Sequence, residues 1–299
     1  MVCVANQKGG VGKTTTAISL AAALAEAGAR VLLVDLDPQG NATTGLGFRV
    51  EEGDPSTYTV LIDGMPIDDA VQTTAIAGLE LLPSSLDLAG AEIELVPAFA
   101  RESRLDRALD SVRDRYQVVI VDCPPTLGLL TVNALAAADR VLLPIQCEYY
   151  ALEGVGQLLR SLDLVRRNLN ESLRLGGVIL TMYDGRTRLS QQVVDEVRRH
   201  FGVRVFRTVI PRSVRLSEAP SFGEPITTFD PASRGALAYL RLAGEFAERL
   251  GIGLRPLSPF ERAGSGDESE GATWGSNRDG PGYNRSRGST ATRREQVDD

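Results

Sequence analysis

A glycine-rich stretch near the N-terminus, residues 6–15 (NQKGGVGKTT), constrains this chain more than any other feature. It contains the only two lysines of the sequence, Lys8 and Lys13, and the other basic side chains, among 32 in total, are arginines. An ammonium group is compact and rotatable whereas a guanidinium is a planar fork, so lysine at these two positions indicates a need for a point charge. A glycine-rich loop that ends in Gly-Lys-Thr is typical of a phosphate-binding site.

The segments on either side of this loop support that interpretation. Residues 2–5 are an apolar run of strand type, and residues 16–27 are an Ala/Leu-rich helical stretch that ends at Gly28. The backbone N–H groups of such a loop, together with the N-terminus of the following helix, form an anion-binding site. We therefore expect the nucleotide to be bound by Gly9, Gly10, Val11, Gly12, Lys13, Thr14 and Thr15.

Within this set, Lys13 would reach the β- and γ-phosphates, and the Thr14 hydroxyl would bind Mg²⁺. The plain alternative, a glycine loop with an incidental lysine, fits the flanking strand and helix poorly. Gln7 stands where the common pattern has its first glycine, and Lys8 follows it. This deviant form resembles the loop of the ParA/MinD/nitrogenase-iron-protein group of ATPases. The resemblance implies that Lys8 contacts the nucleotide of a second subunit.

Length and composition set the fold class. The 299 residues are 43% hydrophobic, enough for one large core. Runs such as residues 118–121, at the start of the segment VVIVD, are continuously apolar, which indicates strands buried on both faces of a parallel sheet. We predict an α/β fold with a doubly wound, mostly parallel sheet over residues 1–254. Residues 255–299 are rich in Gly, Ser and charged side chains and predict a disordered tail without a membrane-binding amphipathic stripe.

The expected elements alternate along the chain. Strands are predicted near residues 2–6, 31–35, 79–83, 118–122, 141–146, 177–181 and 203–209. Helices are predicted near residues 13–27, 101–115, 152–168, 190–201 and 232–250. No apolar run approaches the roughly 18 residues of a membrane span, and a strand begins almost at the N-terminus where a signal peptide would lie. We therefore expect a cytoplasmic protein.

The remaining reactive side chains give little support to other chemistry. Cys3, Cys123 and Cys147 lack the spacing of metal or iron–sulfur ligands and are expected to be buried, reduced thiols. The single histidine, His200, ends a charged helical stretch and is expected at the surface. Histidine-based nucleophilic catalysis is therefore not favoured.

Two acidic strand ends complete the predicted nucleotide site. Asp122 ends the run 118–121, a position that suits a Walker-B carboxylate in the Mg²⁺ shell, although such residues also cap turns. Asp35 ends the second predicted strand and Asp37 follows it, in the sequence DLDPQGNAT. A carboxylate here can orient an attacking water or contact Mg²⁺ through water, which is most of what phosphoryl transfer requires of a protein.

The sequence from residue 2 to about 250 resembles the ParA/Soj chromosome-partitioning ATPases. The similarity is carried by residues 35–43 (DLDPQGNAT), 89–95 (AGAEIEL), 146–154 (QCEYYALEG) and 207–220 (RTVIPRSVRLSEAP). It implies that Asp37 is needed for hydrolysis and contributes with Thr14 and Asp122 to the metal site, that Asp35 serves the strand end or the metal shell, and that Pro211 and Arg212 contact the adenine and ribose. It further implies a weak ATPase that dimerises face to face with ATP.

The positions of the arginines suggest which macromolecule such a dimer binds. From Asp184 to Arg234, nine arginines stand against six carboxylates, while the whole chain has a net charge of −7. A local cationic face fits sequence-independent contact with DNA phosphates, and the resemblance singles out Arg186 and Arg215. The alternative is that these arginines cover solvated helix faces, which we favour for Arg198 and Arg199.

The predicted partners are therefore non-specific double-stranded DNA, a second copy of the chain and a ParB-type protein that stimulates hydrolysis, with no membrane and a nucleoid location. Two other functions stay open. One is a MinD-like or polar cargo-positioning ATPase that uses the same dimer cycle. The other is a small-molecule ligase or kinase on the same fold.

Overall fold

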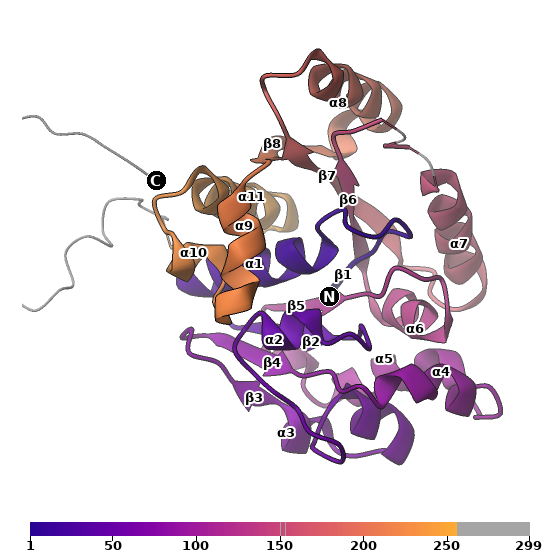
Figure 1. Ribbon diagram of the computed structural model, residues 1–299. Coiled ribbons are helices and arrows are strands. Elements are labelled where there is room, and N and C mark those ends of the chain that lie inside the picture. Colours follow the sequence, from indigo (N-terminus) through magenta and orange to yellow (C-terminus); the bar gives the residue numbers. More distant parts are fainter. Residues whose placement is uncertain (150, 153, 256–299) are drawn as a thin grey trace, which may run out of the picture. The chain divides into compact units, whose positions relative to one another are not determined.

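The computed structural model describes residues 1–149, 151–152 and 154–255. The tail predicted from residue 255 onward lies, from residue 256, outside the described residues. The described chain forms an α/β structure with one central sheet (Figure 1).

The sheet has the strand order β3-β4-β2-β5-β1-β6-β7-β8. Its strands are β1 (Val2–Val4), β2 (Val31–Asp35), β3 (Gln72–Thr73), β4 (Leu79–Leu82), β5 (Val118–Asp122), β6 (Arg140–Gln146), β7 (Arg174–Tyr183) and β8 (Val205–Pro211). Neighbouring strands are parallel except β3, which pairs antiparallel with β4 at one edge. The predicted doubly wound, mostly parallel sheet is confirmed.

Helices cover both faces of this sheet (Figure 1). They are α1 (Lys13–Glu26), α2 (Asn41–Thr44), α3 (Ile67–Ala70), α4 (Leu88–Leu95), α5 (Arg104–Asp110), α6 (Leu129–Ala137), α7 (Val155–Asn168), α8 (Arg188–Phe201), α9 (Val214–Glu218), α10 (Ile226–Phe229) and α11 (Arg234–Leu250). Single turns of other helical types occur at η1 (Thr59–Asp63), η2 (Arg101–Ser103), η3 (Arg113–Arg115), η4 (Gly202–Arg204) and η5 (Ala219–Phe222).

Continuous apolar strands supply two separate cores. In β2, Leu32 and Val34 join the core that also contains residues of α4 to α8, whereas Val31 and Leu33 join the core beneath α1 and α11. Successive side chains of a strand point to opposite faces, so a strand covered on both sides must be apolar at every position. This requirement explains why β2 and β5 could be recognised from sequence.

An edge-strand irregularity is stabilised by one buried carboxylate. The register between β7 and β8 shifts, so that Val178 pairs with Val205 but Leu180 pairs with Val209. Glu245 of α11, only 6% exposed, accepts the backbone N–H groups of Arg207 and Thr208 at 2.8 and 3.0 Å. Burial raises the pKa of Glu245, but these bonds and the nearby Arg249 outweigh it, so the net pKa is lowered.

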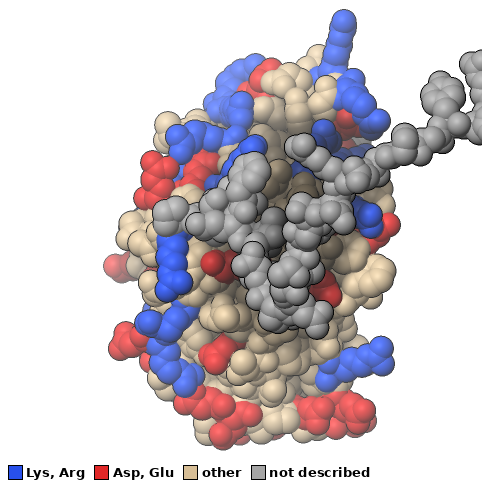
Figure 2. Space-filling model, turned by 90° about the vertical axis from the view of Figure 1, so that its left-hand side faces the viewer, with Lys and Arg blue, Asp and Glu red and all other residues tan. Residues whose placement is uncertain are grey.

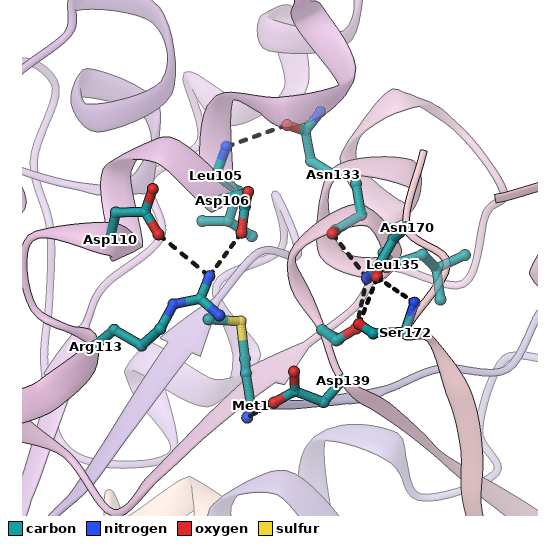
Figure 3. A network of polar contacts seen from close by, with 12 residues as sticks. Met1, Leu105, Asp106, Asp110, Arg113, Asn133, Leu135, Asp139, Asn170 and Ser172 are labelled. Carbon is teal, nitrogen blue, oxygen red and sulfur yellow. Dashed lines mark hydrogen bonds and ion pairs between the residues drawn. The ribbon is translucent and has the colours of Figure 1, made fainter. Parts of the chain in front are cut away.

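Two asparagines fix α6, the helix that follows the loop after Asp122 (Figure 3). The Asn170 side-chain amide donates to the carbonyls of Leu135, Ala136 and Ala138 at 2.8–3.2 Å, which satisfies the C-terminal end of α6. The Asn133 side-chain carbonyl accepts the N–H of Leu105 at 3.2 Å and joins α6 to α5. Helix α6 is therefore connected by hydrogen bonds to α5 at one position and to the segment after α7 at its C-terminal end.

Cys3, Cys123 and Cys147 are free and buried, and His200 is exposed, as expected. Among the described residues, no helix combines the length and apolarity needed to cross a bilayer.

Candidate nucleotide site

The glycine-rich loop and two of the acidic strand ends lie at one edge of the sheet. Strand β5 lies between β1 and β2, and Asp122 is in register with Val4 on one side and Asp35 on the other. The loop that leaves β1 and leads into α1 therefore lies beside both carboxylates. In open parallel sheets, ligands bind at this carboxyl edge.

The loop has the backbone conformation that anion binding requires. Gly10 and Gly12 have φ of +73° and +85°, which a side chain would strain. Gly12 directly precedes α1 and makes no side-chain cap, so the first N–H groups of that helix stay available to a ligand. The loop is anchored by Thr181, whose hydroxyl donates to the Val11 carbonyl at 2.8 Å.

Lys13 lies at the start of α1 with its ammonium inside the site. The residue is 7% exposed, and Nζ lies 3.4 Å from the carbonyl oxygen of Lys8. Burial lowers the pKa of Lys13, and the carboxylates of Asp122 and Asp37 act in the opposite direction. Because this ammonium makes only one long hydrogen bond to a described residue, it is suited to an anionic ligand that completes its coordination.

The side chain of Asp122 is buried, and the fold provides little hydrogen bonding to its carboxylate oxygens. Neither oxygen makes a hydrogen bond of normal geometry to a described residue. Burial and the nearby Asp35 raise the pKa of Asp122 well above its ordinary value, and the Thr14 hydroxyl and Lys13 lower it only in part. Hard oxygen ligands of this kind fit Mg²⁺, which combines one or two carboxylates with phosphate oxygens and water. Thr14 and Asp122 are the residues that would hold it.

Asp35 and Asp37 have different surroundings in the structure. Asp35 is fully buried and accepts the Thr43 N–H and hydroxyl at 2.8 and 2.7 Å and the Asp37 N–H at 3.2 Å. Burial raises the pKa of Asp35 to about 6, against the effect of these bonds. Asp35 therefore fixes the chain after β2, and Asp37 lies at the wall of the cavity described next.

A cavity of about 860 Å³ lies in front of these groups. Its wall brings together seven of the predicted residues, namely Gly9, Gly10, Gly12, Lys13, Thr14, Thr15 and Asp37. Val11 is buried behind the loop, and Lys8 is half-buried outside the wall. The other side of the cavity is formed by residues that the site prediction did not include, among them Met182, Leu216, Ser217, Pro220 and Phe222.

Some of these additional residues could have been found. Leu216, Ser217 and Pro220 fall within residues 207–220, which carry the family resemblance, but no pattern marks Met182. Met182 has φ of +53°, an unusual value for a residue other than glycine. Such backbone strain is often found at ligand sites.

The structure does not bring Pro211 and Arg212 to the cavity wall. The Arg212 side chain points to Glu148 instead, with Nη1 and Oε1 3.3 Å apart, and its backbone N–H donates to the Tyr183 carbonyl. Contact of these two residues with the adenine and ribose stays a prediction.

The two arginines predicted to bind DNA are exposed and paired within the chain. Arg186, with a side chain 88% exposed, forms an ion pair with Asp184 at 2.7 Å and lowers the pKa of that carboxyl. Arg215 pairs with Glu218 and Asp230 at 3.2 and 3.4 Å. Figure 2 shows basic side chains gathered at the upper end of one face, level with α8, whereas acidic side chains predominate at its lower end.

Comparison with known proteins agrees with this geometry. The family model described as AAA domain matches residues 1–175. The sporulation initiation inhibitor protein Soj of Bacillus subtilis is 55% identical over 247 residues, 83% of this chain and 98% of that protein. The chromosome partitioning protein ParA of Myxococcus xanthus is 52% identical over 262 residues, 88% of this chain and 91% of that protein.

A solved structure shows the same fold. The cobyrinic acid a,c-diamide synthase of Mycobacterium smegmatis, crystallised with ADP and magnesium, is 40% identical, with a TM-score of 0.73. The match covers 86% of this chain and 98% of that one. With the phosphate-binding loop and Asp37 gathered around one cavity, and with more than half of the aligned residues shared with Soj and with ParA, the chain belongs to the Soj/ParA family of chromosome-partitioning ATPases.

Proposed function

We propose that this ATPase is a partition switch that binds DNA without sequence preference when it holds ATP and releases DNA after hydrolysis. The cofactors of the site are ATP and Mg²⁺, in keeping with the solved neighbours that contain ADP or an ATP analogue with magnesium. ATP would close two copies face to face, with Lys8 of each reaching the phosphates held by the other. Asp37 would orient the attacking water.

One observation carries the proposal: the segments that bear the two candidate arginines also form the cavity wall. Leu216 and Ser217 of α9 line the cavity, while Arg215, next to them in the same short helix, is exposed. Met182 lines the cavity at the end of β7, and Arg186 follows four residues later. A change in the nucleotide would therefore act on the same segments that present the two guanidinium groups.

The ion pairs of these arginines do not oppose DNA binding. Pairs at exposed positions contribute little to stability because water and salt screen them. A DNA phosphate can replace Asp184 or Glu218 as the partner, and the released counterions favour the exchange. The resulting contact carries no base information, which fits a protein that must bind anywhere on a chromosome.

Co-sedimentation with random-sequence plasmid DNA tests the proposal. Wild type should bind in ATP but not in ADP or without nucleotide, and increasing salt should weaken binding. The Arg186→Ala, Arg215→Ala variant should lose binding, whereas Arg198→Ala, Arg199→Ala, which removes the same charge from exposed positions of α8, should retain it. Absence of binding in every nucleotide state, with hydrolysis intact, would remove DNA from the proposal and favour a MinD-like or polar cargo-positioning function.

In the same scheme, a ParB-type partner stimulates hydrolysis and so returns the protein to the released state. The partner is expected from the family, and its effect is measured as the ATPase rate with and without it. A rate that does not change with any ParB-type protein encoded beside this chain would contradict this part of the proposal.

A second candidate function rests on the solved neighbour that is described as a diamide synthase. A ligase would couple ATP to the activation of a carboxylate, and its ATP consumption would depend on the added acid and on an amide donor. Rates of ATP hydrolysis that are the same with and without cobyrinic acid and glutamine would exclude this function. The identity of 55% to Soj makes it the weaker candidate.

A further inference from the structure

Helix α4 is apolar on both sides, which is unusual for a helix at the surface. Its inner side is packed into the core by Leu88, Ala91 and Leu95. We call the opposite side, together with the turns that flank it, the outer face of α4; it consists of Leu86, Ala89, Ile93, Val96 and Phe99. These side chains are exposed, with Ile93 77% and Phe99 89% accessible.

The outer face follows the periodicity of a helix. Leu86, Ala89, Ile93 and Val96 are separated by three, four and three residues, so they form one stripe. A helix at the surface normally presents polar side chains on the side opposite the core, and this stripe does not. Exposed apolar clusters with a polar rim are typical of protein interaction sites. Figure 1 shows α4 at the outside of the fold next to α6, in the part of the molecule remote from α11.

The rim of this face is acidic. The Tyr58 hydroxyl donates to both carboxylate oxygens of Glu94 at 3.2 Å, and Asp63 and Asp87 lie close enough to Tyr58 to act on it electrostatically.

Two cations near this rim are already engaged. Arg101 donates to the Val96 carbonyl at 2.6 Å and pairs with Glu102, and Arg104 donates to the Leu61 carbonyl at 2.7 Å. An isologous contact with a second copy would therefore bring like charges together. A partner that carries positive charge fits this rim better than a second copy does.

Glu92 connects this helix to the nucleotide site. One of its carboxylate oxygens is buried without a hydrogen-bond partner among the described residues, and it lies so close to Gly128 that a Cβ added there would overlap it. Gly128 immediately precedes α6 and ends the loop that begins after Asp122. Pro125 of that loop lines the nucleotide cavity. The close approach of Glu92 to Gly128 therefore joins α4 to the loop that begins after Asp122, the candidate Mg²⁺ ligand.

We propose that the outer face of α4 is the docking surface for an apolar, positively charged segment of a partner protein. Apolar side chains of the segment would cover Ile93 and Phe99, and its lysine or arginine side chains would meet Asp63, Asp87 and Glu94. The inference rests on the proposed function only where it identifies this partner as the one that accelerates hydrolysis. The contact through Glu92 and Gly128 gives that partner a route to the active site.

Binding of synthetic peptides to the full chain tests the surface directly. The probe is a fluorescent peptide of about 14 residues, roughly 21 Å long as a helix, built from leucine on one side and lysine on the other. A second peptide carries glutamate in place of lysine. Binding is measured by anisotropy without nucleotide and without DNA, so that the result does not depend on the ATP cycle. The test variant is Ile93→Ser, Phe99→Ser, and the matched control is Leu164→Ser, Val203→Ser, which removes two exposed apolar side chains elsewhere.

The lysine peptide should bind wild type and the control alike, at least tenfold more weakly to Ile93→Ser, Phe99→Ser, and more weakly in high salt. The glutamate peptide should bind wild type at least tenfold more weakly than the lysine peptide. Equal binding of the lysine peptide to both variants would overturn the proposal. Because both substituted side chains are largely exposed, the variant should unfold at the wild-type temperature, which shows that any loss is not a folding defect.

A photo-crosslinking residue placed at Phe99 distinguishes the possible occupants. A crosslink to the lysine peptide supports the proposal. A crosslink instead to a second copy of the chain, or to residues 256–299 of the same chain, would show that the surface has another occupant and would overturn it. Failure of DNA co-sedimentation with peptide binding intact would contradict the partition switch and leave the docking surface standing.

Discussion

Replacement of Asp122 by asparagine should stabilise the nucleotide-free protein and abolish its response to Mg²⁺. Both oxygens of this buried carboxylate lack a hydrogen-bond partner among the described residues, and an unsatisfied buried acceptor costs about 1–3 kcal/mol. Asparagine keeps one unpartnered oxygen but removes the negative charge that burial and the neighbouring Asp35 disfavour, so we expect a gain of about 1–2 kcal/mol in the free energy of unfolding. For a chain of this size that corresponds to an increase in Tm of roughly 2–8 °C.

With ADP and Mg²⁺ bound, the wild type should become more stable than Asp122→Asn. A ligand at a hundred times its Kd stabilises the folded state by about 2.7 kcal/mol. In wild type, part of that gain with ADP requires Mg²⁺, because the ion supplies the partner that Asp122 lacks. In Asp122→Asn, the Tm with ADP and Mg²⁺ should equal the Tm with ADP and EDTA. Thermal unfolding of both proteins in EDTA, in ADP with EDTA and in ADP with Mg²⁺ measures each contribution.

Asp35→Asn is the matched control, because it is the same chemical change at the neighbouring register position. The Asp35 carboxylate accepts three hydrogen bonds, two of them from Thr43. An amide would turn a donor toward donors, so this variant should be destabilised by about 1–3 kcal/mol. If Asp122→Asn also lowered the Tm of the nucleotide-free protein, or if its Mg²⁺-dependent shift matched that of wild type, the assignment of Asp122 as an unpartnered metal ligand would be refuted.

Three further changes test the remaining parts of the site and the fold. Asp37→Ala should abolish ATP hydrolysis while DNA binding in ATP persists, and hydrolysis at the wild-type rate would show that our role for Asp37 is wrong. Lys13→Arg should lower the hydrolysis rate at least tenfold, because the planar guanidinium does not fit the space of the buried ammonium; unchanged kinetics would contradict this. Glu245→Gln should lower the free energy of unfolding by about 1–3 kcal/mol at pH 7 through weaker bonds to the β8 backbone. Because the pKa of Glu245 is lowered on folding, its stabilisation is present above the ordinary value of 4.5 and is lost as the pH falls below it, so wild type and variant should converge in acid denaturation curves.

The pattern of apolar residues in the sequence predicted the central strands of the sheet well, and the helices that cover the sheet less well. β2 and β5 were recognisable because both of their faces are buried, and α1 and α11 because their length and composition are helical. α4 and α6 were not predicted as helices, since neither shows one apolar and one polar side. The helix expected over residues 101–115 is divided into η2, α5 and η3. β3 has only two residues and exists through its pairing with β4.

At the candidate nucleotide site, too, some residues are marked by a local sequence pattern and others are not. Lys13, Thr14, Asp37 and Asp122 were predicted because each lies where a strand ends or a loop meets a helix. The supporting hydrogen-bond donors were not predicted: Thr43 lies within the motif at residues 35–43 but received no role, and Ser84 is distant in sequence. The Thr43 hydroxyl donates to Asp35, and the hydroxyl of Ser84 donates to the Asp37 carbonyl at 2.7 Å across 47 positions of sequence. The contact between Ser84 and Asp37 depends on tertiary structure and could not be read from a local pattern.

The different burial of the two lysines has a practical consequence. Lys13 is 7% exposed and Lys8 is half-buried, and the sequence offers no other side-chain amine. An acylating reagent should therefore modify Lys8 first among side chains, and lysyl endopeptidase can cleave only within the phosphate-binding loop. Reaction at these two amines becomes a direct measure of access to the loop in unlabelled, unaltered protein. Protection by nucleotide alone would report on Lys13, and additional protection that depends on protein concentration would report on Lys8 covered by a second copy.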